Sequence, residues 1–247
     1  MYKINKRVFD ITFSAIGILF SSPIVLTALL LVWLYDRNSP IYFAPRIGKD
    51  GKSFKMIKIR SMVVNAQNSG VDSTASGDLR ITPIGKFVRK FKLDELTQFW
   101  NVLLGDMSLV GPRPNVKRDT ELYTSEEKNL LSVNPGITDF ASIIFSDEGE
   151  ILAGQLDPDL AYNQLIRPGK SSLGLFYIEA RSLRIDFVII FLTIITIVSR
   201  ERGLSLTARL LQSLSAPTAL VSLATRAAPL MPTPPPGSNE IVKSRDN

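Results

Sequence analysis

Two adjacent carboxylates, Asp94 and Glu95, begin a helical pattern, and a stiff Pro112-Arg113-Pro114 stretch follows them closely. The chain contains no histidine and no cysteine. This composition excludes a Ser-His-Asp triad, a thiol nucleophile and zinc held by Cys or His. Catalysis would therefore depend on carboxylates, arginines and an oxygen-ligated cation such as Mg²⁺.

The pattern around the two carboxylates predicts one amphipathic helix over residues 93–104, closed by a glycine. Asp94, Gln98 and Asn101 would share a polar stripe of that helix. A helix N-terminus favours carboxylates through its macrodipole and its free amides. One interpretation is therefore that Asp94 and its neighbour only cap and solubilise the helix.

The cations near these carboxylates suggest phosphoryl chemistry instead. Arg89 and Lys90 lie just before them, and Arg113 follows between two prolines that restrict its loop. A guanidinium on a stiff loop suits bidentate binding of phosphate. One carboxylate would attack phosphorus and the other would hold Mg²⁺. The cations would offset the repulsion between an anionic nucleophile and an anionic substrate.

A β-hairpin is predicted over residues 41–62, with its turn at Lys49-Asp50-Gly51-Lys52. The second arm alternates, so Lys58 and Arg60 share the face opposite the neighbouring isoleucines. These two cations either cover a solvated strand face or point at an anionic ligand. The pattern alone leaves both interpretations open.

A long apolar segment occupies residues 11–35, without a charged side chain. It is long enough to cross a bilayer, because a span takes roughly 20 apolar residues. Pro23 should break or kink the helix, and Ser21 and Ser22 can bond the freed carbonyls. Basic residues flank the segment on both sides, and positive charge marks the cytoplasmic side. A re-entrant helix-break-helix satisfies both flanks, whereas a kinked single span satisfies only one.

The remaining sequence is mainly helical in pattern. Residues 65–80 predict a loop, and Thr124 with Glu127 resembles a capping box. Residues 187–198 are apolar but too short to span, so they fit either an interfacial helix or a core helix. The formal charge of +6 and the pI of about 9.5 favour phosphates or anionic lipid as partners.

These patterns together predict an α+β, mostly helical fold in three parts. The first is a re-entrant membrane helix over residues 1–36. The second, over residues 37–203, is a membrane-associated catalytic domain with a small β-hairpin and amphipathic interfacial helices. The third, over residues 204–247, is a low-complexity and disordered tail.

The block from Leu93-Asp94-Glu95-Leu96 to Gly111-Pro112-Arg113-Pro114 resembles the signature of the bacterial sugar transferases, the monotopic phosphoglycosyl transferases. Other stretches that carry the resemblance are Phe9-Asp10, Ser22-Pro23, residues 54–62, Pro135-Gly136-Ile137-Thr138 and residues 182–186. The resemblance covers about residues 3–200. It implies transfer of a sugar-1-phosphate from a UDP-sugar to polyprenyl (undecaprenyl) phosphate through a covalent aspartyl-phosphosugar intermediate, with release of UMP. That reaction would be the first membrane step of exopolysaccharide, O-antigen or glycan assembly.

Carried over position by position, the resemblance makes Asp94 the nucleophile and Glu95 the Mg²⁺ ligand. Residues expected to bind phosphate or to line the site are Arg89, Arg113, Lys58, Arg60, Pro112 and Pro114. Asp186 is expected to be structural. The implied partners are a UDP-sugar donor, the polyprenyl phosphate acceptor and the lipid bilayer, with a homodimer left open. The implied location is the bacterial inner membrane, with a re-entrant N-terminal helix and the catalytic domain on the cytoplasmic face.

The chain departs from the family pattern at Asp139-Phe140, at residues 143–152 and at Gly174, in the part expected to face the sugar. The sequence therefore does not identify the sugar. An alternative from another class is a membrane-anchored adaptor that binds anionic lipid or a protein partner. That alternative gives no reason for two carboxylates and Pro-Arg-Pro in one block. Nucleic-acid binding is disfavoured, because the basic residues lack interleaved aromatics.

Overall fold

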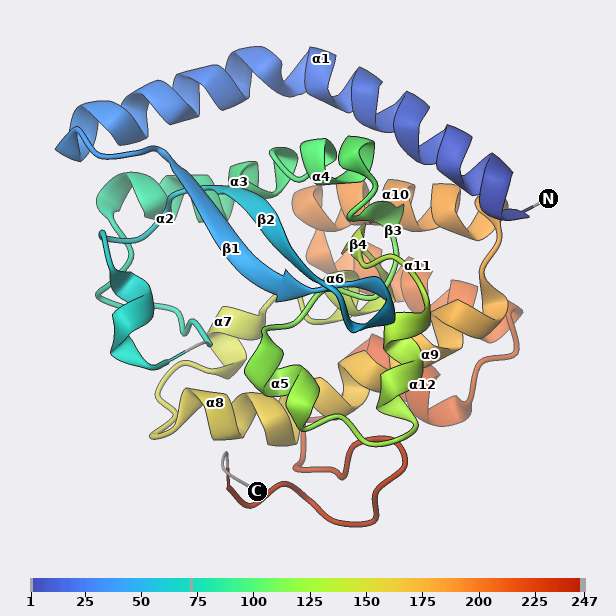
Figure 1. Ribbon diagram of the computed structural model, residues 1–247. Helices are drawn as coiled ribbons and strands as arrows, with labels where there is room; N and C mark the ends of the chain where they lie inside the picture. The colour runs from blue at the N-terminus through green and yellow to red at the C-terminus, as the bar shows by residue number, and fades with distance from the viewer. Residues whose placement is uncertain (1, 72, 245–247) are drawn as a thin grey trace.

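The computed structural model describes residues 2–71 and 73–244, which form a mostly helical fold with small sheets, as the sequence predicts. In Figure 1, the long helix α1 (Tyr2–Asp36) arches along one edge of the molecule, and the C-terminal coil runs along the opposite edge. The other helices pack between these two edges.

The predicted hairpin is confirmed by strands β1 (Ile41–Ile47) and β2 (Ser53–Ile59), which pair antiparallel. The turn η1 (Lys49–Gly51) connects them, and Asp50 and Gly51 adopt left-handed conformations with φ of 57° and 74°. Such positive φ values match the twist of a tight hairpin, which is why Asp-Gly is a strong turn signal.

The remaining elements follow in chain order. They are η2 (Ala66–Ser69), α2 (Pro83–Lys90), α3 (Leu93–Leu96), α4 (Phe99–Leu104), β3 (Ser108–Val110), α5 (Lys117–Glu121), η3 (Glu127–Ser132), β4 (Gly136–Thr138), α6 (Phe140–Ile144), α7 (Glu148–Ile151), α8 (Pro158–Ala161), η4 (Tyr162–Ile166), α9 (Arg167–Ala180), α10 (Leu183–Val198), α11 (Arg200–Ser213) and α12 (Thr218–Thr225). The predicted capping box is confirmed at η3, since Thr124 Oγ1 accepts from the Glu127 amide and Glu127 Oε2 accepts from the Thr124 amide, both at 3.1 Å.

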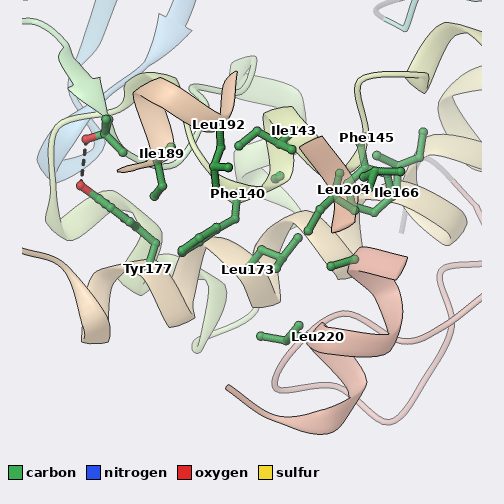
Figure 2. Packing of buried hydrophobic residues seen from close by; sticks show 14 of the residues in the cluster. Phe140, Ile143, Phe145, Ile166, Leu173, Tyr177, Ile189, Leu192, Leu204 and Leu220 are labelled. Atoms are coloured by element: carbon green, nitrogen blue, oxygen red, sulfur yellow. Dashed lines mark hydrogen bonds between the residues drawn. The ribbon is translucent and has the colours of Figure 1, made fainter. Parts of the chain in front are cut away.

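The main core lies between α6, α9, α10 and α11, and Figure 2 shows its apolar side chains in contact. Phe140, Leu173 and Ile189 are completely buried. Burial of each such side chain stabilises the fold by about 1.5–3 kcal/mol. Tyr177 joins this core to the small sheet, because its hydroxyl oxygen lies 3.0 Å from the carbonyl oxygen of Val110 (Figure 2).

Helix α1 differs from the prediction, since it continues through Pro23 as one helix instead of breaking there. The expected role of the serines is confirmed for Ser22. Pro23 cannot donate to the carbonyl of Leu19, and Ser22 Oγ donates to that oxygen instead at 2.9 Å. Thr27 Oγ1 donates to the Pro23 carbonyl at 2.8 Å. The helix therefore accommodates the proline by curving (Figure 1).

Polar contacts attach the N-terminal end of α1 to the domain. Lys6 Nζ lies 3.1 Å from Asp10 and 3.0 Å from Asp186, a fully buried carboxylate that also accepts from the Tyr177 hydroxyl at 2.6 Å. Arg7 donates to two carbonyl oxygens of α4, at 2.6 and 2.7 Å. These contacts agree with a structural role for Asp186.

Apolar side chains remain exposed on α1, which is long and apolar enough to cross a membrane by length and composition. Leu19 and Phe20 are 70% and 76% exposed. Helix α10 is apolar on both sides, with Ile189 in the core and Phe191 exposed. Residues 187–198 therefore form a helix with one face in the core and an apolar face exposed at the surface.

The predicted disorder from residue 204 onward is wrong for the segment up to residue 225, which forms most of α11 and all of α12. Leu204, Ala208 and Leu211 recur at helical spacing and are buried in the core, and Leu220 of α12 joins them (Figure 2). The Ser-, Ala- and Leu-rich composition conceals this amphipathic period. The boundary expected after residue 203 falls inside α11.

Candidate active site

The two carboxylates lie in the first turn of α3, which begins after Lys92 in a left-handed conformation with φ of 51°. Asp94 is only 8% exposed. The predicted helix over residues 93–104 is divided, because α3 ends at Leu96 and α4 begins at Phe99. The first-turn position gives both carboxylates the favourable field of a helix N-terminus.

The predicted polar stripe of Asp94, Gln98 and Asn101 is buried, and its Asn101, together with Thr97, fastens α3 and α4 to strand β2. Thr97 Oγ1 lies 2.9 Å from the carbonyl oxygens of both Ile57 and Asp94. Asn101 accepts from the Ile57 amide at 2.9 Å and donates to the Lys55 carbonyl at 2.8 Å. These side chains satisfy the free edge of β2 and fix the position of Asp94 relative to the strand.

Lys58 of β2 faces Asp94, with its Nζ atom 3.4 Å from Oδ2. Of the two interpretations of its strand face, the structure places this lysine beside an anion. Burial lowers the pKa of Lys58, although the negative charge of Asp94 opposes that effect. The lysine is thus a cation held close to the candidate nucleophile.

Arg113 pairs with Glu95, with its Nη2 atom 2.7 Å from Oε1. Burial alone would raise the pKa of Glu95. The positive charges of Arg113, Lys92 and Lys58 outweigh burial and hold this pKa at about 2. Glu95 is therefore ionised at neutral pH, as a metal ligand must be.

The loop that carries Arg113 is positioned by the close approach of two backbone segments, at Gly111 and at Gly136. A Cβ on Gly136 would lie 2.1 Å from the amide nitrogen of Gly111, so only glycine lets these chains pass. Strands β3 and β4 pair in parallel there, and the Gly136 amide donates to the Pro112 carbonyl at 3.0 Å. Arg113 lies between buried Pro112 and buried Pro114, which limits its backbone freedom.

The other two predicted cations lie in different places. Arg89 of α2 donates to Ser61 Oγ at 2.8 Å and interacts electrostatically with Asp94. Burial lowers the pKa of this arginine. Arg60 instead forms a two-pronged ion pair with Asp36 at 2.6 and 2.7 Å, at the C-terminal end of α1. The structure therefore groups Lys58, Arg89 and Arg113 around the carboxylates and directs Arg60 to α1.

The donor set suits a magnesium ion that also binds substrate. Across residues 2–71 and 73–244, no three His, Cys, Asp or Glu side chains gather as they would in an all-protein metal cage. Mg²⁺ commonly uses one or two carboxylates and completes its shell with water and substrate phosphates. Asp94 and ionised Glu95 offer such a partial set.

The contacts that support the site could not be predicted from periodicity. Asn101 was expected on the polar stripe and Thr97 stands beside it in the helical pattern, but their partner, the edge of β2, is distant in sequence. Tyr162 and Lys170, which line a pocket beside Arg113, also carried no motif signal.

The arrangement places a carboxylate at a helix N-terminus among three cations. Such a site can bring an anionic nucleophile against a phosphate, because the cations compensate the repulsion and the pairing fixes the geometry.

Comparison with known proteins also points to phosphate chemistry. A family model described as bacterial sugar transferase matches residues 1–200. The UDP-N-acetylgalactosamine-undecaprenyl-phosphate N-acetylgalactosaminephosphotransferase of Aeromonas hydrophila is 32% identical over 204 residues, covering 81% of this chain and 45% of the relative. The UDP-glucose:undecaprenyl-phosphate glucose-1-phosphate transferase of Klebsiella pneumoniae is 36% identical over 193 residues, covering 76% and 39%. The undecaprenyl-phosphate glucose phosphotransferase of Komagataeibacter xylinus is 35% identical over 198 residues, covering 77% and 35%. The chain thus spans less than half the length of each of these relatives.

Proposed function

Because this chain belongs to the bacterial sugar transferase family, we propose that it transfers a sugar-1-phosphate from a UDP-sugar to undecaprenyl phosphate and releases UMP. Support comes from the relatives, whose names specify undecaprenyl phosphate as acceptor and UDP-linked sugars as donors. The observation that carries the proposal is the pair Asp94 and Glu95, each held by its own cation, Lys58 and Arg113.

The proposed reaction proceeds in two displacements. A carboxylate oxygen of Asp94 attacks the phosphorus that bears the sugar, the bond from that phosphorus to the bridging oxygen breaks, and UMP leaves with the electron pair. An oxygen of the polyprenyl phosphate then attacks the same phosphorus and releases Asp94, giving a polyprenyl diphosphosugar. Lys58 and Arg89 partly offset the negative charge of the Asp94 carboxylate, and Arg113 binds phosphate oxygens.

Glu95, with Asp94 as a second donor, would hold Mg²⁺. When bound, the ion would neutralise charge on the diphosphate of the donor. Arg113 would then exchange its contact with Glu95 for contacts with the substrate phosphates. The ion pair is therefore a resting arrangement in which both groups are already ionised and in place.

We place the protein in the bacterial inner membrane as a re-entrant protein, with its catalytic domain on the cytoplasmic face. Support comes from the two ends of α1, since Lys6 and Asp36 both make ion pairs with the same domain. The exposed apolar residues of α1 and α10, together with half-exposed Trp100, would lie against lipid. This arrangement brings Asp94 within reach of a phosphate at the membrane surface.

The test is UMP release from a panel of UDP-sugars with Mg²⁺ and undecaprenyl phosphate. Asp94→Asn should abolish release while the protein stays folded and bound to membranes, whereas Asp50→Asn in the exposed hairpin turn should leave it unchanged. Glu95→Gln should weaken both the rate and its dependence on Mg²⁺. Undiminished turnover by Asp94→Asn would refute the assignment of the nucleophile. Absence of UMP release from every donor would favour a membrane-anchored adaptor.

A further inference from the structure

The chain continues beyond α12 as an irregular segment, residues 232–242, which forms a C-terminal strap. The strap belongs to the coil that runs along the edge of the molecule opposite α1 (Figure 1). The family model ends at residue 200, so the family match does not cover the strap. Its sequence begins Pro-Thr-Pro-Pro-Pro, a composition that favours extended polyproline II backbone. Such a stiff segment loses little conformational freedom when it lies down on the protein.

The strap supplies a hydrogen bond that the π-helical turn η4 cannot make with the helix that follows it. In an α-helix, the carbonyl oxygen of Gln164 would accept from the amide of residue 168. That residue is Pro168, which has no amide hydrogen. The Thr233 amide of the strap donates to this oxygen instead, at 3.1 Å. The Gln164 side chain also bonds the strap, because its Nε2 atom donates to the Val242 carbonyl at 2.7 Å.

The strap contacts η3 as well. Thr124 Oγ1 donates to the Pro236 carbonyl at 2.5 Å while it accepts from the Glu127 amide in the capping box. Glu127 is the ion-pair partner of Arg167, which follows η4 directly, and the two side chains are 0% and 1% exposed. The strap therefore ties together the two short helices that hold the two ends of this buried pair. Displacement of either end would leave an uncompensated buried charge.

A chain of contacts leads from the buried pair to the candidate active site. The guanidinium carbon of Arg167 lies 5.6 Å from the centroid of the Tyr123 ring. The Tyr123 hydroxyl accepts from Asn115 Nδ2 at 2.8 Å. Asn115 lies two positions after Arg113, the arginine that pairs with Glu95. Packed side chains and hydrogen bonds of this kind can carry a displacement from one end of the chain to the other.

The strap also starts from a fixed point. Helix α12 lies close to the beginning of α9, since a Cβ on Gly169 would lie 2.8 Å from Leu223 Cδ2. Arg226, which ends α12, pairs with Asp147 at 2.8 Å. Only the short connection 227–231 separates this anchor from the strap. A short tether keeps the strap at a high effective concentration near η4.

We propose that the C-terminal strap is a positioning element of the transferase. It completes η4, holds Arg167 in place, and through Tyr123 and Asn115 supports the loop of Arg113, so that loss of its contact with η4 lowers turnover. The claim about turnover rests on the proposed function. The claim about η4 does not, because it can be measured without substrate.

The test compares two full-length variants at one exposed position of the strap. Thr233→Pro removes the amide donor and prolongs the proline run, whereas Thr233→Ala keeps the amide and is the matched control. In mixed micelles, amide hydrogen exchange over residues 165–171 should become about tenfold faster in Thr233→Pro, as loss of one hydrogen bond to a backbone carbonyl predicts. UMP release should fall in parallel. Thr233→Ala should match the unaltered protein in both measurements.

A second substitution provides a rescue that a general loss of stability would not show. Pro168→Ala restores an amide that can donate to the Gln164 carbonyl from within the helix. Added to Thr233→Pro, it should return both the exchange rate and UMP release toward the values of the unaltered protein. Absence of rescue would mean that Thr233→Pro acts in some way other than through this carbonyl, and would overturn the proposal.

Two further results would also overturn it. Equal exchange rates in Thr233→Pro and Thr233→Ala would show that the strap does not hold η4. Faster exchange with undiminished UMP release would show that the strap stabilises the fold without positioning the site. Both are distinct from failure of the proposed function, in which the unaltered protein releases no UMP from any donor. In that case the claim about turnover falls, while the exchange rates still decide whether the strap holds η4.

Discussion

Replacement of Arg113 by glutamine should destabilise the protein in a manner that depends on pH. Arg113 is the nearest cation to Glu95, whose pKa is about 2 compared with an ordinary value of 4.5. At about 1.36 kcal/mol per pKa unit, this difference corresponds to about 3 kcal/mol. The Glu95 side chain is 20% exposed, so solvent screens only part of the interaction.

The sign follows from the lowered pKa. Ionised Glu95 stabilises the folded state fully above its unfolded pKa, near 4.5, and this contribution disappears as pH falls toward 2. The free energy of unfolding of Arg113→Gln should therefore lie below that of the unaltered protein at pH 7 by at most about 3 kcal/mol, because Lys92 and Lys58 still lower the Glu95 pKa in the variant, and the gap should shrink to roughly half at pH 3.

The assay is denaturant unfolding in mixed micelles with EDTA, so that no metal competes for Glu95. Lys117→Gln serves as the control, because it removes one positive charge from an exposed pair, and it should show a small gap at either pH. A gap for Arg113→Gln that is the same at pH 3 and pH 7 would mean that lost packing, and not the charge on Glu95, explains the effect.

Three further predictions concern other parts of the fold. Leu211→Ala should lower the free energy of unfolding by about 2–5 kcal/mol because Leu211 is fully buried, whereas Leu206→Ala at a 37% exposed position should change it little; equal effects would contradict a packed C-terminal region. Glu127→Gln should cost about 3–5 kcal/mol by leaving buried Arg167 without its charge partner, and denaturant unfolding would measure this, a loss below 1 kcal/mol counting against the buried pair. Pro23→Ala should restore the missing backbone bond and straighten α1, and cysteines placed before and after α1 should then label more often from opposite sides of a vesicle; an unchanged labelling pattern would show that the proline does not set the topology.

Local signals predicted local structure well. The Asp-Gly turn and the Thr124–Glu127 capping box depend on neighbouring residues, and both are present as expected. The carboxylates of α3 were also identified correctly as a first-turn pair with cations nearby. These features need no knowledge of which distant segment will pack against them.

Features that depend on distant partners were predicted less well. The polar stripe with Asn101 was predicted, but its partner was not, because Asn101 binds the edge of β2, which lies 44 positions away. Arg60 and Lys58 share a strand face in the pattern, yet Arg60 stands just past the end of β2 and reaches Asp36. The low-complexity composition after residue 204 concealed an amphipathic helix, because average composition discards the spacing of Leu204, Ala208 and Leu211.

The anchoring of α1 has a consequence for biosynthesis. The Tyr2 hydroxyl lies 3.4 Å from Asp186, a residue 184 positions later in the chain. A ribosome that adds about 5–20 residues per second makes Asp186 about 10–40 s after Tyr2. During that interval Lys6 lacks its buried partner, and the apolar surface of α1 has no domain to lie on. During synthesis the helix therefore needs another partner, such as a bilayer or a chaperone, until the domain that holds it has been made.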